Sequence, residues 1–198
     1  MAKLASIFFS MILVNNYVLV KFLGICPFLG VSKKLDSSVG MSVAVTFVMV
    51  LATAVTWPIY MMILVPRGLE YLQTVSFILV IAALVQLLEL ILKKFIPALY
   101  RSLGIYLPLI TTNCAILGVT ILNIDSGYTF AESIFSSLGS GIGFLLAMVL
   151  FTGVRSTLEY AKPPKSFEGL PITLVAAALT SVSFMGFGGI IESIFGAI

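Results

Sequence analysis

Long apolar stretches alternate with short polar breaks along the whole chain. A transmembrane helix needs about 20 apolar residues to cross a hydrocarbon core of ~30 Å, and the pattern supplies six such stretches. They cover residues of about 4–31, 39–65, 71–92, 99–122, 129–154 and 170–195. The breaks hold turn formers and charges, and none could form a separate soluble domain. We therefore expect one all-α integral membrane domain, residues 1–198, with six transmembrane helices.

The composition of the chain agrees with this fold class. It is 198 residues long, 60% hydrophobic and 10% charged, whereas a soluble domain is ~45–50% apolar and ~25% charged. The absence of histidine excludes an imidazole general base, a Ser-His-Asp triad and histidine-ligated zinc or haem. The net charge of +3 is too small to indicate binding of nucleic acid. Two cysteines cannot build a disulfide framework or supply four thiolates to a metal.

Basic residues gather on one side of the predicted spans. Six spans place both termini on one side with the second and fourth loops, which hold only Lys3 and Arg67. The odd-numbered loops and the helix ends beside them hold Lys33, Lys34, Lys93, Lys94, Arg101, Arg155, Lys162 and Lys165. Because basic loops favour the cytoplasm, we expect these loops to be cytoplasmic and both termini to lie outside.

A six-residue pattern, C-x-x-L-G-V, occurs twice, at residues 26–31 and 114–119. The copies lie 88 residues apart, in the first and the fourth predicted spans, so each belongs to the opening span of a three-helix half. The halves cover about 1–95 and about 96–198. Three is an odd number of crossings, so the second half enters the bilayer from the opposite face. The pattern predicts an inverted-topology repeat, in which binding sites lie near the midplane on broken helices.

Both cysteines stand beside residues that interrupt helices. Gly24 and Pro27 flank Cys26, and Pro108 precedes Cys114. Proline removes a backbone donor, and open backbone in a membrane is tolerated only where protein buries it or water reaches it. We expect two half-helices whose tips present the two thiols to one another. The alternatives are that both cysteines are small packing residues, or that they form a disulfide.

A metal site built on these thiols would be incomplete in this chain. Two thiolates are half of the ligands of a tetrahedral-sulfur iron site or of a [2Fe–2S] cluster. No histidine can supply the rest, so the missing ligands must come from another chain. The most economical arrangement is a pseudo-symmetric dimer with a homologous chain that shares one cluster.

Four other polar residues lie inside the predicted spans. Asn15 and Asn16 could bond across helices or satisfy the broken backbone. Lys21 could offset the negative charge of a thiolate-bound cluster, or it could snorkel to the interface. Glu89 could contribute to an ion path, or it could pair with Lys93 one turn later.

Two glycine-rich stretches have a structural interpretation. Gly139-x-Gly141-x-Gly143 and the run 186–189 place several glycines on successive helix positions. In membrane helices, small residues let backbones approach closely. We expect close helix packing there and assign these glycines no chemistry.

Three segments resemble the A-type membrane component of the Rnf complex. They are residues 14–34 (VNNYVLVKFLGICPFLGVSKK), 103–115 (LGIYLPLITTNCA) and 184–189 (FMGFGG), and the likeness extends over essentially the whole chain. The sister family, the E-type component of the sodium-pumping NADH:quinone reductase, typically has a Glu where Asn15 stands and Thr-Phe-Leu-Ala after its first cysteine. Asn15 and the run 27–30 (PFLG) therefore favour the Rnf family.

The resemblance implies a membrane component of a ferredoxin:NAD⁺ oxidoreductase in the bacterial cytoplasmic (inner) membrane that couples electron transfer to Na⁺ or H⁺ translocation. It implies a pseudo-symmetric pair with the homologous E-type component, and a [2Fe–2S] cluster between them whose ligands here are Cys26 and Cys114. Flavins and further iron–sulfur clusters belong to the other components of the complex (B, C, D and G). Around the cluster we expect Gly24, Ile25, Pro27, Thr112, Asn113 and Ala115.

Two other functions fit part of the pattern. A secondary transporter with a small-molecule site at the repeat interface would also use inverted repeats. The chain has few membrane-embedded polar residues to form such a site. A scaffold protein that only holds redox partners is the third hypothesis, and in that case the cysteines carry no electrons.

Overall fold

The computed structural model describes residues 2–32, 35–95, 107–158, 160, 164 and 167–195, and within these residues all regular structure is helical. The long elements are α3 (Leu35–Ile59), α4 (Gln73–Phe95), α8 (Phe130–Leu158) and α9 (Leu170–Phe195). The shorter ones are α1 (Ala2–Leu13), α2 (Ile25–Val31), α6 (Leu107–Thr111) and α7 (Cys114–Asp125). Three short turns, η1 (Tyr60–Leu64), η2 (Val65–Arg67) and η3 (Glu70–Leu72), connect α3 to α4.

The described helices overlap the predicted spans. Three stretches within the described residues are long and apolar enough to cross a membrane: Leu35–Arg67, Glu70–Ile91 and Phe130–Leu158. The first and the fourth predicted spans are each broken into two shorter helices, as expected: α1 and α2 form one, and α6 and α7 form the other. Five of the basic residues used to orient the chain, Lys33, Lys34, Arg101, Lys162 and Lys165, lie outside the described residues.

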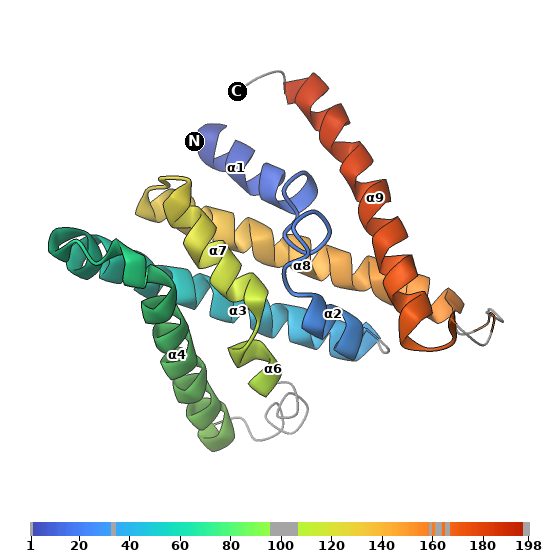
Figure 1. Ribbon diagram of the computed structural model, residues 1–198, viewed down its shortest axis with the longest axis horizontal. Helices are drawn as coiled ribbons and strands as arrows, with labels where there is room; N and C mark the ends of the chain where they lie inside the picture. Colours follow the sequence, from blue (N-terminus) through green and yellow to red (C-terminus); the bar gives the residue numbers. More distant parts are fainter. Residues whose placement is uncertain are drawn as a thin grey trace.

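Helix α8 is the platform on which the other elements pack. It contacts α3 and α1 along its length and also α7 and α9; Figure 1 shows it running behind α7 and beside α3. Two glycines, Gly139 and Gly143, face α1 so closely that an added Cβ would lie 2.8 Å from the Phe8 carbonyl oxygen and 3.1 Å from the Met11 carbonyl oxygen, respectively. Gly141 makes the same kind of approach to Thr46 of α3. The expected close packing is confirmed there.

The second glycine-rich stretch behaves differently. Gly186 of α9 has open space around the position of a Cβ, so close packing within this chain is wrong for that residue. Its helix is largely exposed to the surroundings on one side, with Leu179, Val182 and Met185 all exposed. The side-chain environment of residues 187–189 is not described.

A buried polar cluster fixes the register of α3, α7 and α8. Asn123 of α7 accepts a hydrogen bond from Ser136 Oγ (2.7 Å) and donates to Ser137 Oγ (3.2 Å) and to the Ser133 carbonyl oxygen (3.3 Å). Ser137 and Thr53 of α3 form a further hydroxyl–hydroxyl hydrogen bond of 2.6 Å. All five residues are essentially inaccessible. Because buried polar groups are costly unless paired, sliding one helix past another would break several of these bonds together.

We predict that Gly139→Ala destabilises the protein. The Phe8 carbonyl oxygen is backbone and cannot move aside, so α1 must shift and the free energy of unfolding should fall by about 1–3 kcal/mol. The melting temperature of the purified protein in detergent measures this. The matched control is Gly153→Ala, on an exposed position of α8 with nothing within 4 Å, which should leave the melting temperature unchanged or raise it. Equal values for both variants would contradict the close approach of α1.

Candidate functional site

The first helix break covers residues 14–24, and Asn16 satisfies much of its backbone. Its Oδ1 accepts hydrogen bonds from the amides of Val18 (3.1 Å) and Leu19 (3.3 Å). Its Nδ2 donates to the carbonyl oxygens of Gly143 on α8 (2.8 Å) and Ile12 (3.3 Å). The side chain is completely buried. Asn16 therefore both bonds across helices and caps the broken backbone, which confirms both structural roles expected for it.

Three other residues of the first break, Asn15, Lys21 and Phe22, are partly or fully exposed. Asn15 donates a 3.2 Å hydrogen bond to Ser10 Oγ of α1. Lys21 is exposed, and its Nζ lies 5.3 Å from the centre of the Tyr17 ring. Phe22 has a φ of 56° and a side chain that is 52% exposed. A positive φ at an aromatic residue is strained, and such strain concentrates at functional sites.

The second break is much shorter and is capped by Asn113. Its Oδ1 accepts a 3.0 Å hydrogen bond from the amide of Ala115, the ordinary bond of a helix N-cap. Its own amide bonds to the Ile110 carbonyl oxygen of α6 at 3.2 Å, so α6 and α7 are joined by a tight turn at residues 112–113. Cys114 is consequently the first residue of α7.

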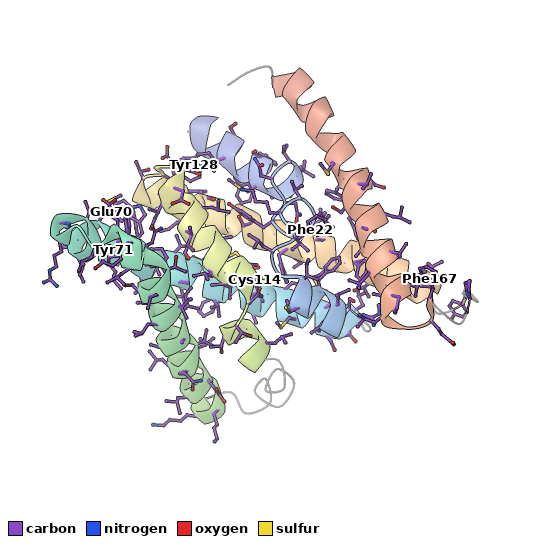
Figure 2. The ribbon with its side chains drawn as sticks, viewed as in Figure 1. Phe22, Glu70, Tyr71, Cys114, Tyr128 and Phe167 are labelled. Atoms are coloured by element: carbon purple, nitrogen blue, oxygen red, sulfur yellow. The ribbon has the colours of Figure 1, made fainter. Side chains whose placement is uncertain are left out.

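The tips of the two half-helices meet at Gly24 and Cys114. The Gly24 amide donates a hydrogen bond to Cys114 Sγ, with 2.9 Å between N and S. Gly24 has a φ of 88°, and a Cβ there would lie 3.0 Å from Phe144 and 3.1 Å from Ala115, so only glycine fits. In Figure 1, α7 runs from this point to the upper left and α2 to the lower right. Figure 2 labels Cys114 at the start of α7. Opposed half-helices that begin beside one another are thus present.

The two cysteines stand in equivalent positions but in different surroundings. Each lies in the first turn of its half-helix, Cys26 as the second residue of α2 and Cys114 as the first of α7. Cys26 is exposed and Cys114 is half-buried. Both are free thiols, so the alternative of a disulfide between them is wrong. Within the described residues no group of three or more His, Cys, Asp or Glu side chains could hold a metal ion.

Proline does not cause the first break. Pro27 is buried in the first turn of α2, where a backbone N–H has no partner within the helix, so its ring is tolerated there. The residue that ends the break is Gly24, which has a left-handed backbone conformation and directly precedes α2.

Helix α2 is anchored by a contact that sequence reasoning missed. Arg155, in the last turn of α8, donates hydrogen bonds to the Leu29 carbonyl oxygen (2.6 Å) and to Ser32 Oγ (2.9 Å). A cation beside the C-terminal carbonyl groups of a helix is favourable because of the helix dipole. Phe28 and Phe151 also stack, with ring centres 4.1 Å apart. Arg155 reads as a loop charge in the sequence, where nothing connects it to residues more than 120 positions away.

The remaining predicted residues divide into two groups. Ile25 is half-buried, Thr112 is exposed, and Ala115 is completely buried against Gly24, so these three flank the meeting point of the tips. Glu89 is half-buried on α4, a helix that packs against α6 and α7. A role for Glu89 or Lys21 in ion movement stays a prediction.

These features define a multi-pass, all-helical membrane protein whose two cysteines open half-helices that meet at one point. Residues 4–191 match the family described as "Rnf-Nqr subunit, membrane protein". The chain belongs to this family, which confirms the resemblance carried by the cysteine-containing segments.

Relatives match over nearly the full length. The chain is 58% identical over 183 residues to the A-type component of the Na⁺-translocating ferredoxin:NAD⁺ oxidoreductase complex of Acetobacterium woodii, covering 92% of this chain and 95% of that protein. It is 52% identical over 191 residues to the A-type component of the ion-translocating oxidoreductase complex of Syntrophotalea carbinolica, with 96% and 99% covered. For the protein of the same description from Serratia proteamaculans, identity is 54% over 192 residues, with 97% and 100% covered.

We predict that Asn16→Ala lowers the free energy of unfolding by at least about 2 kcal/mol, because it leaves the amides of Val18 and Leu19 and the Gly143 carbonyl buried without this partner. Asn15→Ala removes one half-buried bond to Ser10 and should cost about 1 kcal/mol or less. Thermal unfolding in detergent compares the two. If Asn15→Ala were the more damaging change, Asn16 would not be the main cap of the break.

Gly24→Ala should separate the two tips. The positive φ of residue 24 is unfavourable for alanine, and the added Cβ would press on Phe144 and Ala115. We therefore expect the amide of residue 24 to move away from Cys114. In a Cys26→Ser background, we expect faster maleimide labelling of Cys114 than in the same background with Gly24 intact. Gly30→Ala, where a Cβ meets nothing, is the matched control and should leave the labelling rate unchanged. Equal rates for both glycine variants would show that the tips do not depend on Gly24.

Proposed function

We propose that the chain is the A-type membrane component of an ion-translocating ferredoxin:NAD⁺ oxidoreductase complex, the Rnf complex, and that Cys26 and Cys114 hold half of a [2Fe–2S] cluster. The observation that carries this proposal is the contact between the Gly24 amide and Cys114 Sγ, which joins two half-helix tips that each open with a cysteine. The homologous E-type component supplies the other two ligands. Flavins and further iron–sulfur clusters are held by the other components of the complex (B, C, D and G).

The residues at the tips suit an anionic iron–sulfur group. Thiolates are the protein ligands of such clusters, and backbone amides near the sulfurs stabilise their negative charge. The Gly24 amide already donates to Cys114 Sγ, and Cys114 stands at the N-terminus of α7, the positive end of the helix dipole. Buried Asn113 adds a side-chain N–H beside this position. The donor set therefore fits the proposed group.

An uncovered face of α2 supports a homologous partner. Cys26 and Gly30 are one helical turn apart and both exposed, so they lie on the same face of α2. Gly30 meets nothing within 4 Å of its Cβ position, whereas its counterpart in the second copy of the motif, Gly118, packs tightly against Leu23. The glycine of the second motif copy is thus packed within the chain, whereas the glycine of the first copy has open space beside it. A homologous chain covering the open copy would complete both the packing and the ligand set.

The architecture we propose is an inverted repeat of two three-helix halves. The opposite directions of α2 and α7 and the twofold occurrence of the cysteine motif support it (Figure 1). An even number of crossings keeps both termini on one side, and the distribution of basic residues in the sequence favours the outside of the bacterial cytoplasmic membrane.

When bound, the cluster supplies one-electron transfer across the middle of the membrane. The chain's own contribution is to hold two thiolates and to surround them with donors in a region of low dielectric, where a change of charge acts strongly on its neighbours. We propose that charge at the two tips biases the broken halves between inward-facing and outward-facing arrangements, coupling electron transfer to movement of Na⁺ or H⁺. Asn15, Asn16, Lys21 and Glu89 are the polar residues proposed to take part in charge compensation or coupling.

The ligand assignment predicts that Cys26→Ser and Cys114→Ser each abolish the cluster. The wild-type chain is co-purified with its homologous partner, and iron content and the electron paramagnetic resonance signal of the reduced sample are measured. Each serine variant should lose the signal while the pair still co-purifies, and Val154→Ala, an exposed change on α8, should keep it. A cluster that survives either substitution defeats the assignment.

Further outcomes separate the other functions. Normal electron flow in the Cys26/Cys114 double variant would indicate a scaffold. Solute uptake by vesicles that contain this chain alone, insensitive to removal of iron, would indicate a secondary transporter.

A further inference from the structure

Asn113 has a buried side-chain nitrogen without a hydrogen-bond partner in the described structure. Its side chain is only 4% exposed, and its Nδ2 has no hydrogen-bond partner among the residues that the structure describes. A buried donor without an acceptor is unfavourable, and such groups call for an explanation in a native protein.

The identity of the unpaired atom follows from the helix cap. Oδ1 of Asn113 accepts a hydrogen bond from the Ala115 amide at 3.0 Å. Exchanging the two ends of the carboxamide would turn Nδ2 toward that amide and set one donor against another. The cap therefore requires the oxygen on its side, and the atom left unpaired is the N–H donor.

The location of this donor points to its acceptor. Asn113 immediately precedes Cys114, and its Oδ1 lies 3.5 Å from the place that a Cβ on Gly24 would occupy. Gly24 itself donates to Cys114 Sγ. The carboxamide thus lies close to Gly24, the residue whose amide already donates to the Cys114 sulfur.

We propose that the Asn113 Nδ2–H group donates to a sulfur of the bound cluster, either the Cys114 thiolate or an adjacent sulfide, and raises the reduction potential of the cluster. This inference rests on the proposed function. N–H groups that donate to cluster sulfurs stabilise the more negative, reduced form and so favour reduction. Asn113 acts as a positioning and tuning residue rather than as a ligand.

The two copies of the motif differ at this position. The residue before Cys26 is Ile25, whose side chain carries no donor, and Cys26 is exposed. The residue before Cys114 is the buried Asn113. Of the two thiolates from this chain, the one at Cys114 therefore receives the donors, and polar stabilisation of the added electron is concentrated on that side of the site.

The test separates the cap from the donor. Asn113→Gly is well tolerated at an N-cap and has no side-chain donor, whereas Asn113→Ala loses both the donor and a favourable cap. The complete complex is purified and its cluster is titrated electrochemically, with the paramagnetic signal as readout. We expect Asn113→Gly to lower the ratio of reduced to oxidised cluster at a fixed potential by about tenfold, or about 59 mV for a one-electron couple. Gly153→Ala should have the wild-type midpoint.

A second variant removes the donor while it keeps the side-chain cap of the helix. Asn113→Asp keeps the shape and the cap, removes the donor and adds a negative charge nearby, so its midpoint should fall at least as far as that of Asn113→Gly. An unchanged midpoint in either variant with a full cluster, combined with a lower melting temperature of Asn113→Ala, would show that Asn113 is only a cap and would overturn the inference. A wild-type complex without this cluster, or one that keeps it after Cys114→Ser, would instead overturn the proposed function.

Discussion

Backbone groups that leave a helix inside a membrane have no water to bond with, and the arrangement of this chain follows from that constraint. The first break spans residues 14–24 and is made tolerable by Asn16, which serves two amides and the Gly143 carbonyl at once. The second break is confined to a tight turn closed by Asn113. Asn16 uses both the donor and the acceptor of its carboxamide, whereas Asn113 closes the second break with its side-chain acceptor alone.

Helix α8 supplies the rigid support that keeps the first broken segment in place. It contacts that segment at three levels: Gly143 accepts from Asn16, Phe151 stacks on Phe28, and Arg155 binds the Leu29 carbonyl. Small residues on α8 let α1 and α3 approach its backbone, while its serines bond to α3 and α7. A site built from irregular backbone needs such support, because its own hydrogen bonds are too few to define one geometry.

The position of the tips creates an unequal environment for two equivalent thiols. Both cysteines lie in the first turn of a half-helix, but Cys114 is half-buried and receives the Gly24 amide, whereas Cys26 faces outward from α2. A negatively charged group spanning both would be stabilised by this chain on one side and left open on the other. The open side is the surface on which a homologous chain is proposed to complete the ligands, so the asymmetry fits a site divided between two chains.

The local pattern of the sequence determined the helix positions, the two broken spans and the pairing of the cysteines as half-site candidates, because apolar run length and a repeated motif are local signals. It also anticipated the close packing at Gly139, Gly141 and Gly143 and the capping by Asn16. Only the tertiary structure decided that Pro27 lies inside a helix, that Gly24 touches Cys114, and that Arg155 anchors α2. The contacts of Gly24 with Cys114 and of Arg155 with α2 join residues 90 and 126 positions apart, respectively. Their geometry depends on how complete helices pack, which no local pattern contains.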